Sequence, residues 1–396
     1  MGIRAFSAAL LCWFLTATAA SAAPVPGVTD TEITIGITGP LSGPAAAWGT
    51  IALASEAYAK YVNDHGGVNG RKLKIVLKDD GYNPGRAVAN VSEMKDNVFA
   101  IIGTVGTAVL NAIKDIVAES GIPLVYPLGD VEVFAKQPKA KVRTVFQAYP
   151  EYSDETEFLV QQAAKLEGVK KIALFGQNDD WGKGALEGVK RGVAKVPGMT
   201  LVTDVFYSVT DRELGTYALK LKESGAEAIV LCSTATHGAG LIKEMAKVGY
   251  RPKIFASFIL YDRDTMFRLL GDLWEGVYFD TVVSMRGEPA ADKIIDIVTK
   301  IDPKFKGREG FAVQGAADIM VLVEGLKRAG RNLTRENFVK AMETIKDYDE
   351  DGLSPPVTFG PDRHHGLNAV RLMRAVKASD GSIKQITPIQ HFPPHF

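Results

Sequence analysis

Cysteine is almost absent from this chain of 396 residues, which contains only Cys12 and Cys232. Cys12 lies in an N-terminal segment that we expect to be removed, so a disulfide within the mature chain is excluded. The fold must therefore be stabilised by a hydrophobic core. We interpret Cys232 as a small buried residue rather than a nucleophile, because no base lies near it in the sequence.

An excess of charge of one sign is also missing. The chain contains 46 Lys and Arg residues and 46 Asp and Glu residues. Without a basic excess there is no electrostatic field that would collect the phosphates of a nucleic acid. We therefore expect no nucleic-acid partner.

Long hydrophobic runs are limited to one short stretch near the N-terminus. Ala8 to Ala20 is apolar, but its length of about 13 residues is below the roughly 20 that a membrane-spanning helix needs. The stretch follows Arg4 and precedes the small residues Ala20-Ser21-Ala22. This pattern predicts that residues 1–23 are a secretory signal peptide and that the mature protein is exported.

Catalytic motifs are absent as well. The sequence has no G-x-S-x-G elbow, no G-x-x-x-x-G-K-S/T phosphate loop and no H-E-x-x-H metal motif. His364 and His365 stand in a polar turn where neighbouring side chains diverge, so we expect them in a solvated loop rather than at a metal. We predict a protein that is not an enzyme, with no catalytic residue, no metal site and no cofactor.

Short apolar strands alternate with amphipathic helices along most of the chain. Strands end in loops rich in small or polar residues and lead into helices, which is typical of a parallel sheet covered on both faces. The alternation begins again near residue 170. The predicted strands are 33–37, 72–78, 98–102 and 123–126, then 170–175, 201–207, 228–231 and 253–256. The predicted fold class is therefore α/β, with two similar lobes.

The last third of the chain has a different pattern. Three helices and a β-hairpin around Asp380-Gly381 are expected there. Because these segments must complete both lobes, the chain has to pass between the lobes several times, as in a hinge. We assign residues 31–144 and 280–354 to lobe 1, and residues 145–279 and 355–396 to lobe 2.

The loops that follow the predicted strands contain aromatic and hydroxyl side chains. The aromatic residues are Trp48, Trp181 and Phe258, and the hydroxyl residues are Thr107, Ser233 and Ser257. In open α/β sheets, ligands bind at the carboxyl ends of the strands. Because these loops come from both lobes, we expect them to line a cleft between the lobes.

Several motifs resemble those of the periplasmic leucine/isoleucine/valine-binding proteins. They are Ile35–Gly49 (IGITGPLSGPAAAWG), Asn63–Gly70 (NDHGGVNG), Leu77–Asp80 (LKDD) and Val357–Gly360 (VTFG). The resemblance covers nearly the whole mature chain. It implies a type I periplasmic binding fold with two Rossmann-like lobes and three hinge crossovers. It also implies a periplasmic monomer that encloses a small-molecule ligand by lobe closure and delivers it to the membrane permease of an ABC importer.

The resemblance also implies roles for five residues. Each matches a ligand-contacting position of the family: Trp48 an aromatic wall, Thr107 a hydroxyl that holds the ligand carboxylate, Leu128 a backbone contact, Trp181 an aromatic cover on lobe 2, and Leu231 a wall of lobe 2. The role of Thr107 is physically reasonable, because a buried anion needs several donors and a helix N-terminus supplies them.

Two positions depart from the amino-acid-binding pattern of the family. Asp130 stands where a hydroxyl is common, and Phe258 stands where an acid commonly pairs with the ligand ammonium. Either Asp130 replaces the missing carboxylate, or the ligand has no ammonium and Phe258 stacks on a ring. We predict binding of a small carboxylate-bearing ligand. A branched-chain or other hydrophobic amino acid is the leading hypothesis. An aromatic carboxylate, a ligand-sensing role and, more distantly, a secreted α/β enzyme are the alternatives.

Overall fold

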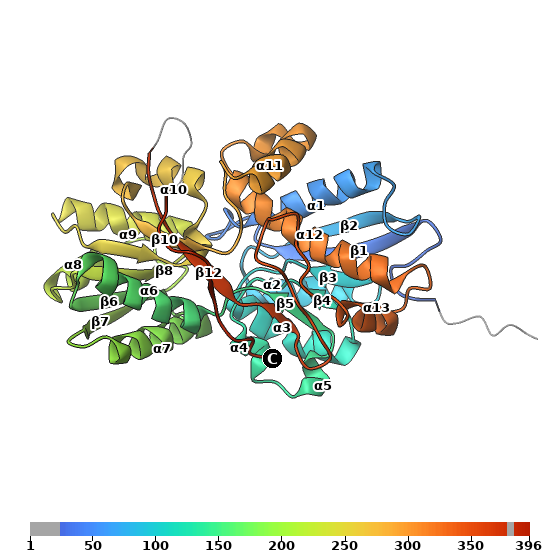
Figure 1. Cartoon of the computed structure of the whole chain (residues 1–396), viewed down its shortest axis with the longest axis horizontal. Coiled ribbons are helices and arrows are strands. Elements are labelled where there is room, and N and C mark those ends of the chain that lie inside the picture. Colours follow the sequence, from blue (N-terminus) through green and yellow to red (C-terminus); the bar gives the residue numbers. More distant parts are fainter. Residues whose placement is uncertain (1–23, 378–383) are drawn as a thin grey trace, which may run out of the picture.

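Two α/β lobes lie side by side in the computed structural model, which describes residues 24–377 and 384–396 (Figure 1). Each lobe is built around its own sheet. The central strands of each sheet run parallel to one another. The two-lobed α/β prediction is confirmed. The predicted signal peptide and the Asp380-Gly381 turn lie outside the described residues.

The sheet of lobe 1 has six strands in the order β11-β5-β4-β3-β1-β2. Helices α2 and α3 pack together on one face, while α1 and α12 pack together on the other. The strands are β1 (Glu32–Gly39), β2 (Lys72–Asp79), β3 (Ala100–Ile102), β4 (Leu124–Val125), β5 (Val145–Ala148) and β11 (His365–Leu367). The helices are α1 (Gly49–Asp64), α2 (Pro84–Met94), α3 (Thr107–Ser120), α4 (Glu132–Ala135), α5 (Lys139–Val142), α11 (Pro289–Ile301), the short 3-10 turn η3 (Pro303–Phe305), α12 (Glu309–Ala329) and α13 (Arg335–Met342).

The sheet of lobe 2 has the order β13-β12-β10-β9-β8-β6-β7, with β14 paired to β12. The strands are β6 (Lys171–Gln177), β7 (Thr200–Tyr207), β8 (Ala228–Cys232), β9 (Lys253–Ala256), β10 (Tyr278–Thr281), β12 (Ala369–Arg374), β13 (Lys384–Gln385) and β14 (Gln390–His391). The helices are α6 (Tyr152–Glu167), α7 (Asp180–Lys195), α8 (Gly215–Glu223), α9 (Ala235–Lys247), η1 (Phe258–Leu260), α10 (Arg263–Leu270) and η2 (Gly271–Trp274). The antiparallel pairing of β12 with β13 is the predicted C-terminal hairpin.

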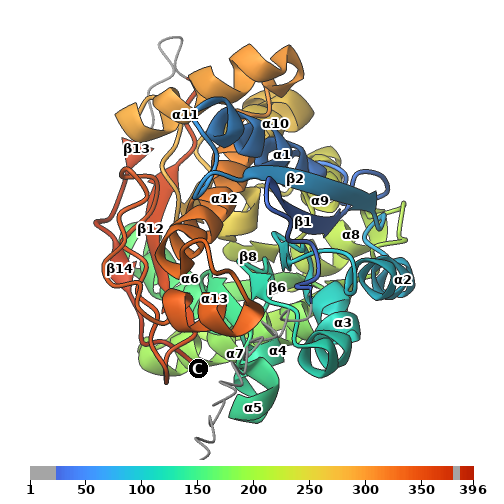
Figure 2. The ribbon, with the colours of Figure 1, turned by 90° about the vertical axis from the view of Figure 1, so that its right-hand side faces the viewer.

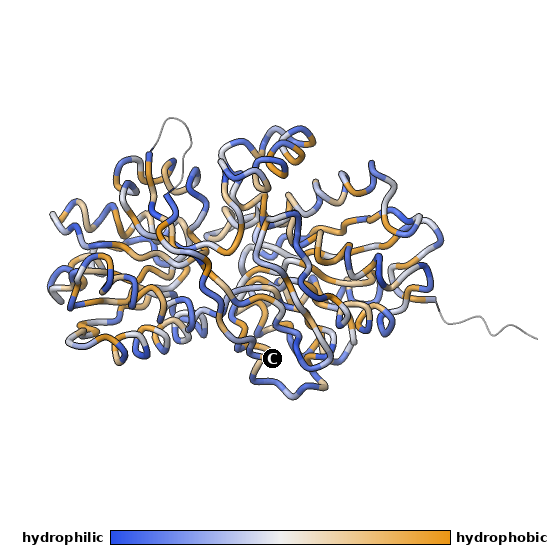
Figure 3. Tube along the Cα trace, viewed as in Figure 1, coloured by the Kyte–Doolittle hydropathy of each residue, from blue (hydrophilic) through white to orange (hydrophobic). Residues whose placement is uncertain are grey.

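Apolar residues concentrate along the strands and on the inner faces of the helices (Figure 3). Cys232 is buried at the end of β8, as its sequence context indicated. None of the helices in the described ranges is both long enough and apolar enough to cross a membrane.

The chain passes between the lobes after β5, after β10 and after β11. Strand pairing places residues 145–148 and 365–367 in the sheet of lobe 1, and residues 278–281 in the sheet of lobe 2. The first two crossovers therefore lie a few residues from the boundaries expected at 145 and 280. The third follows residue 367, so residues 365–367, which were assigned to lobe 2, belong to the sheet of lobe 1. The sequence of a short apolar strand does not indicate which of the two sheets it joins. The sequence pattern therefore could not locate these boundaries more closely.

The C-terminal tail is a further link between the lobes. It pairs through β14 with β12 of lobe 2 and then runs to lobe 1 (Figure 2), where Phe396 packs against Phe134 with ring centroids 6.3 Å apart. Between these two anchors, His395 bonds to Glu132 of α4 at 2.7 Å and to Asp154 of α6 at 2.9 Å. The imidazole therefore joins the two lobes through charged partners.

His364, just before β11, and His365, its first residue, are both buried, so the prediction of a solvated loop is wrong for them. His364 stacks on Phe146, with ring centroids 4.3 Å apart, and His365 Nε2 bonds to the carbonyl of Tyr149 at 2.8 Å. Backbone N–H groups of both histidines donate to a main-chain oxygen of Phe396. Their neighbours in space come from distant segments, which the local sequence does not reveal.

Gly315 allows α12 to pack directly against α1. A Cβ atom at this position would lie 2.2 Å from the carbonyl oxygen of Ile51. We expect Gly315→Ala to lower the free energy of unfolding by about 1–3 kcal/mol, because the two helices must separate. Urea denaturation measures this change. Gly360→Ala is the matched control, since a Cβ there meets nothing within 4 Å. Equal stability of the two variants would contradict the packing argument.

The His395 bridge makes stability depend on pH. Hydrogen bonds to Asp154 and Glu132 raise the pKa of His395 from 6.5 to about 10. A raised pKa means that the stabilisation is fully present below pH 6.5 and is lost as the pH rises towards 10. We expect His395→Gln to lower stability most near pH 6, with the difference from wild type shrinking by pH 10. Urea denaturation between pH 6 and pH 10 tests this; a constant difference would exclude a charged bridge.

Candidate functional site

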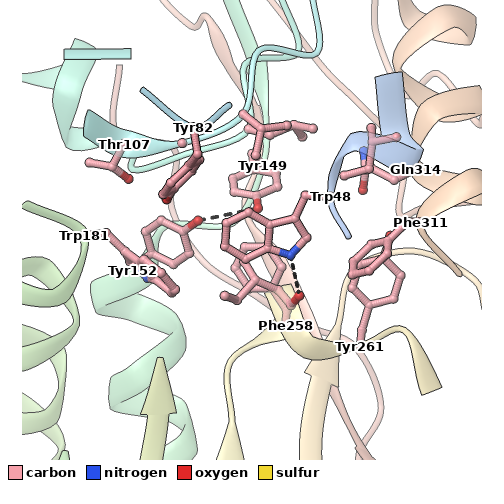
Figure 4. Close-up of a pocket in the computed structure, with 15 residues that line it drawn as sticks. Trp48, Tyr82, Thr107, Tyr149, Tyr152, Trp181, Phe258, Tyr261, Phe311 and Gln314 are labelled. Atoms are coloured by element: carbon pink, nitrogen blue, oxygen red, sulfur yellow. Dashed lines mark hydrogen bonds between the residues drawn. The ribbon is translucent and has the colours of Figure 1, made fainter. Parts of the chain in front are cut away.

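Eight aromatic side chains line a pocket between the two lobes, which we call the aromatic pocket (Figure 4). They are Trp48, Tyr82, Tyr149, Tyr152, Trp181, Phe258, Tyr261 and Phe311. The remaining lining residues are Ile51, Val105, Gly106, Thr107, Leu128, Ile259 and Gln314. None of the described residues that line the pocket carries a carboxylate, ammonium, guanidinium or imidazole group.

Trp48 and Tyr82 form the wall contributed by lobe 1. Trp48 immediately precedes α1, and its ring meets that of Tyr82 edge to face at 5.6 Å. Tyr82 follows β2 and has a positive φ of 61°, which is uncommon for a residue other than glycine. Its hydroxyl accepts a hydrogen bond from Gln177 Nε2 of lobe 2 at 3.3 Å. The Tyr82 ring is therefore held in place from both lobes.

The N-terminus of α3 supplies hydrogen-bond donors at one end of the pocket. Gly106 precedes the helix with φ 112°, and a Cβ there would lie 2.5 Å from the Tyr82 ring, so only glycine fits. Thr107 is the first helical residue, and its Oγ1 accepts from the Asp130 N–H at 3.0 Å, which leaves its hydroxyl hydrogen available. The first N–H groups of a helix have no intrahelical partner and attract anions. This end can therefore hold a carboxylate.

Lobe 2 contributes Trp181 from α7 and Phe258 from η1. The Phe258 N–H donates to Glu155 Oε1 at 2.7 Å, which anchors the loop, and the Phe258 ring stacks on Tyr152 at 5.5 Å. Trp181 meets Tyr152 at 5.4 Å, and its indole Nε1 is buried without a hydrogen-bond partner. An unpaired buried donor is costly, so this N–H is suited to a ligand acceptor.

The lobes are closed over the pocket. Trp48 Nε1 donates across the cleft to the Ile259 carbonyl at 3.3 Å, and Asn111 Nδ2 donates to Asp180 Oδ2 at 2.7 Å. Trp48 also contacts Trp181 across the cleft, with ring centroids 6.4 Å apart. The cavity that remains in the aromatic pocket has a volume of about 30 Å³. This volume is enough for roughly two waters. A ligand must therefore enter a more open arrangement and replace these ring contacts.

Five of the seven residues predicted as ligand contacts come together in the aromatic pocket. They are Trp48, Thr107, Leu128, Trp181 and Phe258. Leu231 does not line the pocket, because it is fully buried within β8, between β6 and β9. The hydroxyl groups of Ser233 and Ser257 are also buried behind the pocket rather than in its lining.

Asp130 also lies outside the aromatic pocket. It faces a polar cavity between the lobes, beside Glu132, Glu151 and His395. Its Oδ1 accepts from the Glu132 N–H at 2.9 Å. Burial, and then the charge of Glu151, raise the pKa of Asp130 well above its usual range. Asp130 is therefore poorly suited to serve as the counter-ion of a ligand in the aromatic pocket.

Sequence reasoning missed ten lining residues, among them five aromatic residues and one amide: Tyr82, Tyr149, Tyr152, Tyr261, Phe311 and Gln314. Two of them offered a signal, because Tyr82 and Tyr149 stand in the loops that directly follow β2 and β5. Tyr152 lies just after the first crossover, Tyr261 follows η1, and Phe311 and Gln314 lie on α12, which reaches the pocket only through the tertiary fold. Within the described ranges, no group of three or more His, Cys, Asp or Glu residues could hold a metal ion.

Comparison with known proteins identifies the family. The periplasmic binding protein family matches residues 32–382. The chain is 26% identical to Leu/Ile/Val-binding protein homolog 3 of Brucella melitensis, covering 80% of this chain and 84% of that protein.

Two solved structures share the fold. A branched-chain amino acid ABC transporter protein from Thermus thermophilus with bound valine has a TM-score of 0.81 at 19% identity, covering 91% of this chain and 97% of its own. A solute-binding protein of an ABC transporter from Rhodopseudomonas palustris BisB5, in complex with 3,4-dihydroxybenzoic acid, has a TM-score of 0.77 at 20% identity. The match covers 92% of this chain and 98% of that chain. The expected type I periplasmic binding fold and the resemblance to the Leu/Ile/Val-binding proteins are confirmed. This chain belongs to the periplasmic binding protein family and is a solute-binding protein.

Proposed function

We propose that this protein captures a small aromatic carboxylate in the periplasm and presents it to the permease of an ABC importer. The observation that supports the proposal is the composition of the aromatic pocket, which has eight aromatic rings and no charged side chain among its described lining residues. The ammonium of an amino acid would be buried there without an anion, which is costly. A benzoate-like ligand needs no such partner.

The geometry suggests how the ligand lies. Its carboxylate is held at the N-terminus of α3 by Thr107 and the free backbone N–H groups, with Trp181 Nε1 as a further donor from lobe 2. Its ring packs between Trp48 of lobe 1 and Phe258 of lobe 2. Contacts from both lobes to one ligand favour the closed arrangement over the open one, and no reaction is involved.

A hydrophobic amino acid is the second candidate ligand. It is favoured by the names of the relatives, which include several Leu/Ile/Val-binding proteins. It would require a carboxylate to approach the aromatic pocket, and Asp130 is the acid that the sequence pattern favours for this role. The same proposal includes three further points. The chain is exported by its predicted signal peptide, it acts as a monomer, and it serves transport rather than sensing.

A ligand panel distinguishes the two candidates. We expect benzoate to raise the melting temperature of the purified mature protein and leucine and valine to leave it unchanged, because only a ligand that binds the folded state stabilises it. Cyclohexanecarboxylate keeps the carboxylate but lacks the aromatic ring, and benzylamine keeps the ring but lacks the carboxylate. These two compounds are the controls. Isothermal titration calorimetry measures the affinities. Stabilisation by leucine or valine without any response to benzoate would overturn the proposal.

Substitutions at Thr107 and Asp130 test the two positions independently. We expect Thr107→Val to weaken benzoate binding about tenfold or more, since a hydrogen bond to a charged group is worth about 1.5–3 kcal/mol. Thr107→Ser, which keeps the hydroxyl, is the matched control. Asp130→Asn, which keeps an acceptor for the Glu132 N–H, should change the affinity less than about threefold. A larger loss in Asp130→Asn than in Thr107→Val would favour ammonium pairing instead.

A further inference from the structure

Gln314 is the polar side chain at the end of the aromatic pocket opposite Thr107 (Figure 4). It extends from α12, and only 3% of its surface is exposed. Its Nε2 donates to Asp318 Oδ1, one helical turn further on, at 2.9 Å. This bond fixes the orientation of the carboxamide.

The carboxamide oxygen of Gln314 is available to a ligand. No hydrogen bond from any described residue reaches Oε1, and this oxygen is not among the fully buried side-chain atoms that lack a partner. Its surroundings in the pocket are aromatic rings such as Tyr261 and Phe311, which bury it in a largely apolar wall. An acceptor in such a wall favours a ligand that brings a hydrogen-bond donor to it.

Asp318 holds this arrangement from behind. It is fully buried on α12, and a Cβ at Gly103 would come within 2.8 Å of its Oδ2, so the loop after β3 packs closely against the carboxyl. Helix α12 itself packs along α1 in the core of lobe 1. Asp318 is a positioning residue, because it is absent from the pocket lining and acts through Gln314.

We propose that Gln314, positioned by Asp318, selects aromatic carboxylates that carry a hydroxyl group on the ring at the end away from the carboxylate. This inference rests on the proposed function and narrows its ligand class. The carboxylate lies at the N-terminus of α3, the ring lies between the aromatic walls, and the hydroxyl donates to Gln314 Oε1. A site built to bond a hydroxyl discriminates strongly against an analogue that lacks it, because the acceptor is then left unpaired.

The test compares benzoate, 3-hydroxybenzoate and 4-hydroxybenzoate by isothermal titration calorimetry. In the wild-type protein, we expect at least one hydroxybenzoate to bind about tenfold or more tightly than benzoate. Gln314→Met has a similar size and shape but no acceptor. It should remove this preference, so that benzoate and the hydroxybenzoates bind with similar affinity. Circular dichroism and the melting temperature check that the variant is folded.

Asp318 is tested by the same ratio of affinities. Asp318→Asn keeps an oxygen that can accept from Gln314 Nε2 and should retain the preference for the hydroxybenzoate. Asp318→Leu removes the acceptor and should lose the preference, with benzoate binding as the measure of intact folding. A purely structural role for Asp318 would weaken all three ligands by the same factor.

Three results would overturn the inference. Equal binding of benzoate and both hydroxybenzoates by the wild type would refute the selection of a hydroxyl, while the proposed binding of aromatic carboxylates would stand. A preference that survives Gln314→Met would assign the hydroxyl to another group. Failure of all three acids to bind, by contrast, would refute the proposed function together with the inference.

Discussion

The direction of the parallel strands is the constraint on which the site depends. In a parallel sheet all carboxyl ends lie at one edge, so the loops after β2, β3, β4 and β5 reach the same side of lobe 1. In lobe 2, the loop after β9 and the start of α7 likewise lie at the carboxyl ends of the strands. Because these edges face each other, residues that are far apart in the sequence, such as Trp48 and Ile259, become hydrogen-bonded neighbours. The aromatic pocket is a product of this arrangement.

Buried carboxyl groups surround the pocket without entering it. Asp318, Glu155 and Asp280 are fully buried, and burial raises the pKa of each; for Glu155 the pKa is about 7. Raised pKa values favour the neutral, protonated forms, which lowers the repulsion that these acids would exert on a ligand carboxylate. Two of these acids, Glu155 and Asp318, instead accept hydrogen bonds from groups that shape the pocket. Phe258 is anchored to Glu155 in this way, and Gln314 to Asp318.

Much of the fold could be predicted from the sequence, because the βα alternation and the glycine-rich loops after the strands are local features. The aromatic walls Trp48, Trp181 and Phe258 were found for the same reason, since each stands close after a strand. Gln314 was missed, because its helix reaches the pocket only through packing of α12 on α1. Leu231 was assigned to the wall, but a residue near the end of a strand points into the core as readily as into a cleft.

Asp130 shows a second limit of sequence reasoning. It lies in the loop after β4, as the sequence indicates, but the direction of its side chain was not predictable. The backbone N–H of Asp130 donates to Thr107 Oγ1, while its carboxyl group points towards Glu132 and Glu151. One residue can therefore bond to Thr107, in the proposed anion site, through its main chain and leave the aromatic pocket uncharged.

The C-terminal tail sets a mechanical limit on lobe opening. His391 is paired in the sheet of lobe 2, while His395 and Phe396 are bound largely on lobe 1. The four-residue step from His391 to His395 can span at most roughly 14 Å when fully extended. Wider separation of these two anchor points requires Phe396 to leave its contacts or β14 to unpair. The segment from His391 to Phe396 thus limits, by its length, how far these two anchor points can separate while both sets of contacts are kept.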